Sequence, residues 1–269
     1  MSLATNSKNE PPFYLMTTSN PSPDPKQLAS IRIVLARPSH PGNIGAAMRA
    51  MKTMGLSQLY LVAPAVFPNS KADAMAAGAA EELAQARVCA TLEEALADTT
   101  LVLGVSARRR DIVTDVLTPP EAAMRLLTES QAAPVALVFG NETSGMSNEE
   151  VSLCQGLVTI AANPEYSSLN LAAAVQVLCY EIRQTWLNHA SWPQPGLDAA
   201  TGEEIERMYA HLEATLGEID FLNHGSPGKL MLKLRWLFAR TRLSKEEVNI
   251  LRGILTATQV AKRGRNADK

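Results

Sequence analysis

The chain has 269 residues, of which 46% are hydrophobic, and its formal net charge is −2 at pH 7. The three cysteines are scattered without a CxxC pair, which argues against a disulfide framework or a zinc site. No apolar run reaches the roughly 18 residues of a membrane span, so we expect a cytoplasmic protein. Residues 1–30 lack a signal-peptide pattern, and their Ser, Pro, Asn and Thr content predicts a disordered extension.

Short apolar runs alternate with helical patterns between residues 31 and 187. The predicted strands are residues 31–36, 58–63, 88–90, 100–105, 135–139 and 157–161. The predicted helices are residues 44–54, 72–86 with a break near Gly78, a short helix after Thr91, 119–129, a helix opened by Ser147, and 169–178. This alternation predicts an α/β domain with a mainly parallel sheet that helices cover on both faces.

Loops follow four of these strands, at residues 37–45, 104–108, 140–145 and 160–170. Because ligands bind outside the carboxyl ends of strands in α/β sheets, we expect these loops to converge on one site. Each loop taken alone also fits an ordinary connection. In that interpretation Asn43 caps the following helix, Glu142 caps a turn, and Ser167 or Ser168 caps the helix from residue 169.

A linker is predicted at residues 188–200, which contain two prolines and a glycine, and a helical module follows at residues 201–269. From residue 221 onward the chain has eleven Lys and Arg residues against three acidic residues, so this end carries +8 and the remainder −10. A basic end on an acidic body indicates a polyanionic partner. A solvated basic helix without such a partner is the alternative.

The common catalytic and phosphate-binding motifs are absent from the sequence. It contains no GxGxxG after a strand, no GxxxxGK[ST], no HExxH and no GxSxG. The four histidines, His40, His189, His211 and His224, are scattered and fit surface or structural roles better than a metal site, so no metal is expected. The residues alone therefore predict an α/β ligand-binding domain with a basic helical end.

Three segments resemble, in order, the three motifs of the SPOUT class of RNA methyltransferases: His-Pro-Gly-Asn-Ile-Gly-Ala-Ala-Met-Arg-Ala-Met-Lys-Thr-Met-Gly at 40–55, Leu-Val-Phe-Gly-Asn-Glu-Thr-Ser-Gly at 137–145, and Ile-Ala-Ala-Asn-Pro-Glu-Tyr-Ser-Ser-Leu-Asn-Leu-Ala-Ala-Ala-Val at 160–175. With residues 249–255, the chain resembles the bacterial tRNA (cytidine/uridine-2′-O)-methyltransferases that modify nucleotide 32 of the anticodon loop. The resemblance covers residue 31 to the early 260s. It implies a C-terminal trefoil knot, a homodimer, the cofactor S-adenosylmethionine and tRNA as the substrate.

The resemblance also implies the site residues. The implied catalytic residues are Arg49, Asn43, Ser168, Glu142 and Asn170. The implied cofactor-binding residues are Val105, Ser106, Ala107, Gly140, Ile160, Ser167, Ser168 and Leu169. Many relatives have Thr where Val105 stands, so a contact there is expected from the backbone. The expected RNA-binding residues are Arg108, Arg109, Arg110, Lys229, Lys233, Arg235, Arg240 and Arg252.

Arg49 matches the catalytic arginine of the family, which has been assigned as the general base. A guanidinium has a pKa above about 12, so orienting a phosphate or stabilising an alkoxide is the easier role for it. Asn43 is expected to position Arg49 or the ribose, and Glu142 to hold the arginine or a group of the partner subunit. Two alternatives remain open at this point. One is a nicotinamide-dependent oxidoreductase, against which the missing GxGxxG counts, and the other is a non-catalytic RNA-binding protein.

Overall fold

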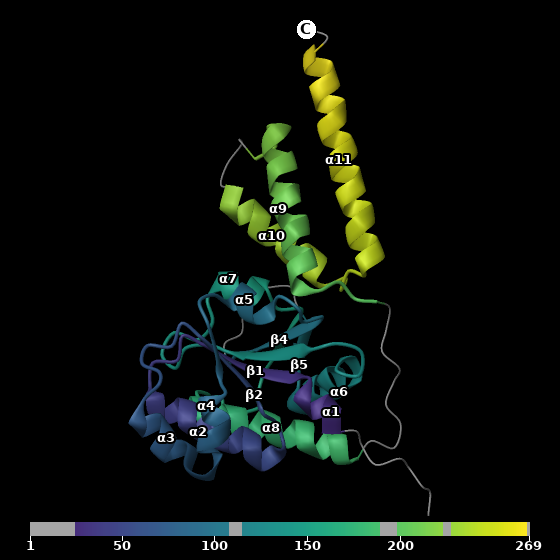
Figure 1. The fold of residues 1–269 in the computed structure, drawn as a ribbon. Coiled ribbons are helices and arrows are strands. Elements are labelled where there is room, and N and C mark those ends of the chain that lie inside the picture. Colours follow the sequence, from purple (N-terminus) through teal and green to yellow (C-terminus); the bar gives the residue numbers. More distant parts are fainter. Residues whose placement is uncertain (1–24, 108–114, 189–197, 223–226, 268–269) are drawn as a thin grey trace, which may run out of the picture.

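The computed structural model describes residues 25–107, 115–188, 198–222 and 227–267, which form an α/β domain and a helical module (Figure 1). The strands are β1 Ile31–Ala36, β2 Gln58–Val62, β3 Arg87–Cys89, β4 Leu101–Val105, β5 Asp115–Leu117, β6 Val135–Phe139 and β7 Gly156–Val158. The helices are α1 Pro25–Ala29, α2 Pro41–Met54, α3 Ser70–Ala76, the 3-10 helix Ala77–Ala79, α4 Ala80–Ala84, α5 Leu92–Leu96, α6 Pro119–Glu129, α7 Asn148–Ser152, α8 Leu171–Leu187, α9 Gly202–Glu218, α10 Pro227–Ala239 and α11 Lys245–Ala267.

The described strands form one sheet in the order β3-β2-β1-β6-β4-β7-β5, and every neighbouring pair is parallel. β1 lies between β2 and β6, and all six of its residues are buried. Burial on both faces explains why β1 is an uninterrupted apolar run apart from Arg32. The predicted parallel sheet is confirmed, and the loops after β1 and β6 leave the sheet side by side.

Two apolar layers cover the sheet. Ile31, Ile33 and Leu35 pack with residues of α2, α3, α6 and α8 on one face. Val34 and Ala36 pack with residues of α5 and α7 on the other face. Figure 1 shows these two layers below and above the sheet. The alternation along β1 follows from the strand geometry, in which successive side chains point to opposite faces.

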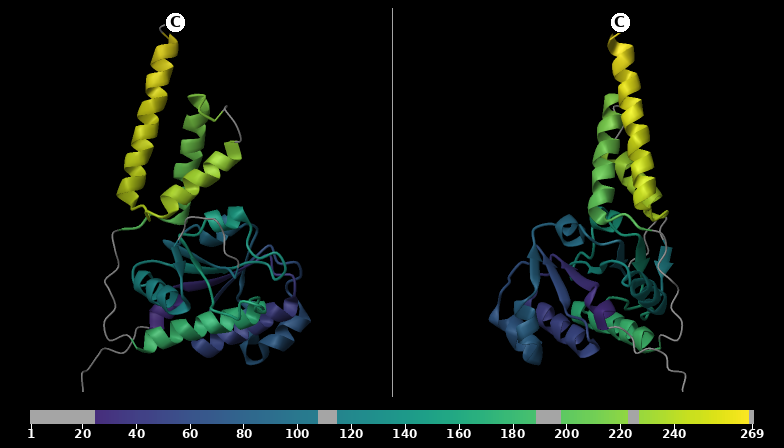
Figure 2. Two further views of the ribbon diagram at one scale, coloured as in Figure 1. Left: turned by 180° about the vertical axis from the view of Figure 1, so that it is seen from behind. Right: turned by 45° about the vertical axis from the view of Figure 1, so that its right-hand side comes forward.

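The helical module stands on the side of α5 and α7 (Figure 1), and α11 runs beside α9 and projects away from the sheet in both views of Figure 2. Its described core is small: Met208, Tyr209, Leu243 and Val248, with Ala200. Backbone hydrogen bonds attach its start to the α/β domain, from Gly202 N to Thr99 O at 2.9 Å and from Glu203 N to Ala97 O at 2.8 Å. Arg242 adds an ion pair to Glu129 at 2.9 Å.

Both predicted helix caps in the motif loops were wrong. α2 begins at Pro41 with His40 as its N-cap, because proline lacks an N–H and has a helical φ, which suits the first turn. Asn43 therefore lies inside the helix. α8 begins at Leu171, and Asn170, not Ser167 or Ser168, is its cap, with a side-chain oxygen that accepts from Ala172 N at 2.9 Å and Ala173 N at 3.4 Å.

Three other expectations need correction. Residues 25–29 of the expected disordered extension form α1, and Leu28 is buried. The edge strand β5 was missed, because three largely exposed residues give no recognisable pattern. The predicted last strand is shorter and begins at Gly156. The trefoil knot stays a prediction, since residues 108–114, which join β4 to β5, lie outside the described residues.

Candidate active site

One pocket lies at the carboxyl ends of β4 and β6, where the motif loops meet. Val105, Ser106 and Ala107 leave β4, and Gly140 to Thr143 leave β6. The third side is formed by Ile160 and by Ser167 to Leu169, in the segment that leads into α8. All eight residues expected to bind the cofactor thus line this single pocket. The apolar part of the wall includes Phe139, Ile160 and Leu169, and the polar part includes backbone groups and two serine hydroxyls.

Gly140 shows how tightly the loop after β6 is folded. A Cβ placed on Gly140 would lie 2.3 Å from both Gly145 C and Met146 N. Only the absence of a side chain lets the two ends of the loop approach in this way. Asn141 fixes the turn between them, because its side-chain oxygen accepts from Thr143 N at 2.9 Å and Ser144 N at 3.1 Å.

Glu142 ties this loop to the start of α2. Its carboxylate accepts from Ser39 N at 2.9 Å, Ser39 Oγ at 2.8 Å, His40 N at 3.2 Å and Asn43 Nδ2 at 3.0 Å. Burial opposes the charge of the carboxylate, but these hydrogen bonds prevail and lower the pKa of Glu142 to about 2. The ionised carboxylate thus satisfies free donors at a helix start that has no side-chain cap of its own.

Asn43 joins the first and third motifs. It donates to Glu142, and its side-chain oxygen accepts from Asn170 Nδ2 at 3.0 Å. Asn170 in turn caps α8. The chain Glu142–Asn43–Asn170 therefore connects all three motif loops within one protomer. Within one chain the Asn43 amide contacts Glu142 and Asn170, and its expected role in positioning Arg49 or the ribose stays a prediction.

Arg49 lies apart from this network. Its side chain is exposed on α2, and it has no ion-pair partner among the described residues. Six residues separate Arg49 from Asn43, which corresponds to about 600° of helix and places the two side chains about 120° apart. All four donors to Glu142 come from residues 39–43, so the expected contact between Glu142 and Arg49 is not made within one chain.

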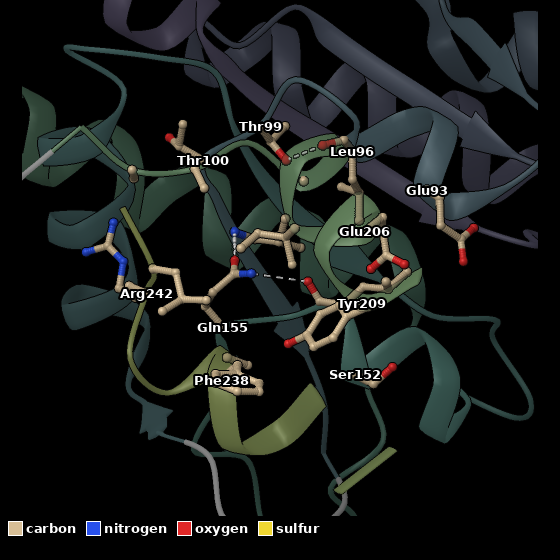
Figure 3. A pocket seen from close by; sticks show the side chains of 18 residues that line it. Glu93, Leu96, Thr99, Thr100, Ser152, Gln155, Glu206, Tyr209, Phe238 and Arg242 are labelled. Carbon is tan, nitrogen blue, oxygen red and sulfur yellow. Dashed lines mark hydrogen bonds between the residues drawn. The ribbon is translucent and has the colours of Figure 1, made fainter. Parts of the chain in front are cut away.

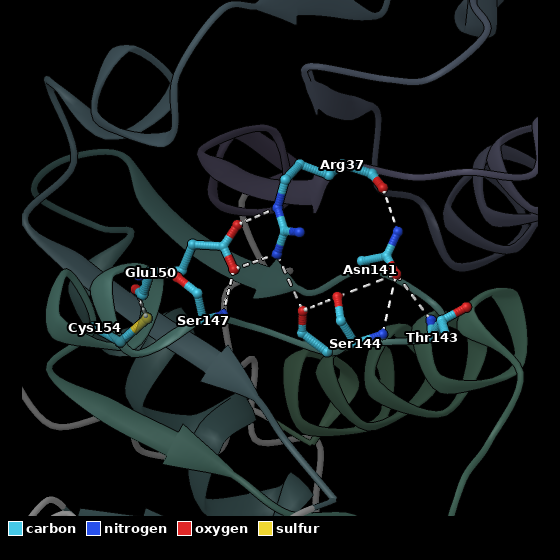
Figure 4. A network of polar contacts seen from close by, with 8 residues as sticks. Arg37, Asn141, Thr143, Ser144, Ser147, Glu150 and Cys154 are labelled. Carbon is cyan, nitrogen blue, oxygen red and sulfur yellow. Dashed lines mark hydrogen bonds and ion pairs between the residues drawn. The ribbon is translucent and has the colours of Figure 1, made fainter.

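A second polar network, which the sequence reasoning missed, supports the same loops (Figure 4). Arg37 follows β1 with a positive φ of 53°, and Nε and Nη2 donate to the Glu150 carboxylate at 2.9 and 2.8 Å. Nη2 also donates to Gly145 O at 3.2 Å, and Asn141 Nδ2 donates to Arg37 O at 2.7 Å. The one signal in the sequence was Ser147 with Glu150 three residues on, a capping box whose carboxylate also serves Arg37.

The residues expected to bind RNA fall into three groups. Arg108, Arg109 and Arg110 lie outside the described residues. Four others are exposed on α10, at its end or on α11: Lys229, Lys233, Arg240 and Arg252. Arg235 is different, because its Nη1 and Nη2 donate to Glu206 at 2.5 and 2.7 Å and its guanidinium lies 4.4 Å from the centre of the Tyr209 ring. These contacts hold Arg235 within the module, and its expected contact with RNA stays a prediction.

A pocket at the seam between the α/β domain and the module lies beside this pair (Figure 3). Leu96, Val102 and Gln155 line it from one side, and Tyr209 and Phe238 from the other. The Gln155 side-chain oxygen accepts from Val102 N at 2.6 Å, which holds the start of β7 against β4. This pocket belongs to the packing of the two parts and contains none of the predicted site residues.

The described residues contain neither a candidate metal site nor a candidate membrane span. No group of three or more His, Cys, Asp or Glu side chains there could hold a metal ion. No helix among them is both long and apolar enough to cross a membrane.

Residues 30–180 match the model of the SpoU rRNA Methylase family. The chain belongs to the SpoU methylase family. Residues 203–269 match a second model, the C-terminal domain of the tRNA methyltransferase TrmJ. The two matches coincide with the α/β domain and with α9 to α11, on either side of the predicted linker.

Other SpoU methylases resemble the whole chain. The tRNA (cytidine/uridine-2′-O-)-methyltransferase TrmJ of Escherichia coli K12 is 48% identical over 250 residues, which cover 90% of this chain and 100% of that protein. TrmJ of Klebsiella pneumoniae is 48% identical over 88% of this chain and 100% of its own length. Among solved structures, TrmJ from Z. mobilis ZM4 has a TM-score of 0.76 at 36% identity and covers 84% of this chain and 97% of its own. A methylase family protein from Neisseria gonorrhoeae has a TM-score of 0.62 at 43% identity, over 69% of this chain and 95% of its own.

Proposed function

We propose that this SpoU-family chain methylates the ribose 2′-hydroxyl of a cytidine or uridine in tRNA, at position 32 of the anticodon loop, with S-adenosylmethionine as the methyl donor. One observation carries the proposal. Residues from the β4, β6 and α8 loops, far apart in sequence, line one pocket in a chain that matches a tRNA methyltransferase domain at its other end. The reaction belongs to the cytoplasm, where tRNA is modified.

The pocket suits a nucleoside cofactor. Ile160 and Leu169 provide apolar surfaces for a planar base, and Ser167 and Ser168 provide hydroxyls for polar edges. Gly140 keeps the loop after β6 tightly folded at the wall of the pocket, because its missing side chain leaves room for Gly145 and Met146. Val105 has no hydroxyl, so any polar contact at that position comes from its backbone. When bound, S-adenosylmethionine supplies a methyl group on a positively charged sulfonium, which is a good leaving group.

The remaining motif residues position the substrate and stabilise the negative charge on it. Glu142, Asn43 and Asn170 hold the start of α2 and the start of α8 in fixed positions beside the pocket. Fixed loops keep the acceptor oxygen in line with the methyl group, which is a large part of the catalytic effect in a transfer reaction. The Arg49 guanidinium binds the phosphate next to the target ribose or the developing alkoxide.

Arg49 acts in the pocket of a partner subunit in the proposed homodimer. It is exposed on α2, which packs beside α8 on one face of the sheet. Tyr180 and Leu187 of α8 are about half exposed, at 47% and 49%, which is unusual for large apolar side chains and fits a contact with a second copy. A shared face of this kind is the usual arrangement in a two-fold dimer.

The test of catalysis is methyl transfer from labelled S-adenosylmethionine to unmodified bulk tRNA, followed by nucleoside analysis. We expect a 2′-O-methylated pyrimidine from the anticodon loop, and no transfer by Arg49→Ala with unchanged folding and cofactor affinity. Labelled methyl groups at another nucleotide would show that the enzyme modifies a different position of the tRNA. A folded protein that binds tRNA without any incorporation would contradict the proposal in favour of a binding protein.

The dimer has its own test. Arg49→Ala and the pocket variant Leu169→Asp are each inactive alone, and are mixed after mild dissociation. If Arg49 acts across the interface, random mixing gives one intact site in half of the dimers, so about a quarter of the wild-type activity returns. If Arg49 serves its own pocket, one intact site would need both residues in one chain, and no activity returns.

A further inference from the structure

The proposed reaction needs a proton acceptor, because the 2′-hydroxyl loses its hydrogen as its oxygen attacks the methyl group. Most groups gathered at the site are unsuited to this task. Arg49 is already protonated, and the amides of Asn43 and Asn170 do not take up protons near neutral pH. Glu142 is ionised, but the donors around it lower its pKa to about 2, which makes it a very weak base.

His40 lies next to this carboxylate, at the N-cap of α2. Its Nδ1 is 2.8 Å from Ser39 Oγ, and Ser39 Oγ is 2.8 Å from Glu142 Oε2. Its backbone N–H donates to Glu142 Oε1 at 3.2 Å. The ring is anchored at one edge, while the side chain as a whole is 69% exposed.

The hydrogen atoms in this chain fix the state of the ring. Ionised Glu142 can only accept, so the single hydroxyl hydrogen of Ser39 is donated to it. Ser39 Oγ then accepts from His40, which requires the hydrogen of the neutral imidazole to be on Nδ1. Nε2 is left with a free lone pair on the opposite, exposed edge. In a catalytic triad a carboxylate orients the histidine directly. Here Glu142 orients His40 in the same way, but through the hydroxyl of Ser39, which lies between them.

We propose that His40 Nε2 accepts the proton of the ribose 2′-hydroxyl, with Ser39 and Glu142 as the positioning residues. This inference rests on the proposed function. As the bond between the 2′-oxygen and the methyl carbon forms, the bond between that carbon and sulfur breaks, and its electron pair stays on sulfur as a neutral thioether. The proton moves from the 2′-oxygen to Nε2. The positive charge lost at sulfur reappears on the imidazolium, 3.8 Å from Glu142 Oε1 at its nearer nitrogen, and the proton then passes to water.

The surroundings of His40 define the pH dependence. The charged group that lies against His40 is Glu142, from the loop after β6. Histidine is the ordinary side chain whose charge changes between about pH 5 and 8. A histidine accepts a proton only when its imidazole is neutral, so the proposal predicts a methylation rate that falls as the pH is lowered.

The experiment measures single-turnover methyl transfer to unmodified tRNA by the full-length protein in saturating excess, from about pH 5.5 to 8.5. We expect His40→Gln to lower the rate constant by roughly 10²- to 10³-fold and to abolish the loss of rate at low pH. Affinities for S-adenosylmethionine and tRNA, measured separately by calorimetry and filter binding, should change by less than about twofold. Free imidazole should restore part of the activity of His40→Ala.

Two further variants complete the test. Ser39→Ala should lower the rate constant of methyl transfer about tenfold. Its pH dependence should remain, because the imidazole is still present but is no longer oriented. His211→Gln, a histidine change on α9 away from the pocket, should leave the rate and its pH dependence unchanged. The proposal is overturned if His40→Gln keeps the wild-type rate or its pH dependence, or if its loss of rate is accompanied by weaker cofactor binding. An inactive wild type would contradict the proposed function instead.

Discussion

The α/β domain and the helical module are held together in different ways. In the α/β domain, backbones approach closely, as at Gly45, whose Cβ would lie 1.9 Å from Ala72 O, and polar networks lock the loops after β1 and β6. In the module, a small core is supplemented by ion pairs, and Gly217 and Gly253 have open space around them. A pocket for a small cofactor needs groups fixed within fractions of an ångström, whereas a surface for a polyanion needs only exposed cations.

The largest expected effect on stability comes from adding a side chain where two helices approach closely. Gly45→Ala forces α2 away from α3, because the new methyl group overlaps backbone atoms that cannot turn aside. We expect a loss of about 3 kcal/mol in the free energy of unfolding, seen as a drop of roughly 10 °C in Tm. The matched control is Gly253→Ala on α11, which should stabilise the helix by up to about 1 kcal/mol. Equal effects of the two changes would show that the regions are packed alike.

The second prediction compares a half-buried ion pair of the module with an exposed one. Glu206→Gln leaves the half-buried Arg235 guanidinium without its carboxylate, and we expect a local loss of about 1–2 kcal/mol. Hydrogen exchange should accelerate in α9 and α10 and stay unchanged in the sheet. Glu218→Gln, which breaks an exposed pair with Arg263, should change stability by less than about 0.5 kcal/mol. Accelerated exchange in β1 or β6 would contradict the separate packing of the two parts.

The third effect is a pH dependence confined to the α/β domain. The pKa of Glu142 is lowered to about 2 in the folded chain, so its contribution to stability is present above the ordinary glutamate pKa and is lost as the pH falls toward 2. Glu142→Gln should therefore melt several degrees below the wild type at pH 7. The difference should shrink from about pH 5 downward. Melting curves at pH 7, 5 and 3 check this, and a difference that grows at low pH would give the wrong sign.

The smallest expected effect is on the charged surface of the module. Lys229→Gln with Lys233→Gln should weaken tRNA binding severalfold and reduce the slope of log affinity against log salt by up to about 0.7–0.9 for each phosphate that is no longer neutralised. Stability should hardly change, since both side chains are exposed. Lys26→Gln on α1 removes the same kind of charge from the other part of the molecule and should leave the salt slope unaltered. If both variants had the same slope of log affinity against log salt, the tRNA would bind away from Lys229 and Lys233.

The sequence by itself determined the elements whose signals are local. The bounds of residues 31–36, 119–129 and 135–139 agree with β1, α6 and β6, because an apolar run or a capping proline depends only on its neighbours in the chain. The helix start at Ser147 was also found for this reason. The convergence of the loops followed from the alternation of strands and helices, whereas the individual pocket residues came from the resemblance to a family.

Only the tertiary structure decided the partners of the polar side chains. Glu142 meets Ser39 and Asn43, about a hundred residues earlier, because β6 lies beside β1 in the sheet. For the same reason Glu150 reaches Arg37. Arg235 of α10 pairs with Glu206 of α9, which lies 29 residues earlier in the chain. A charged side chain takes the nearest partner in space, and the order of the strands, which no local pattern encodes, sets that distance.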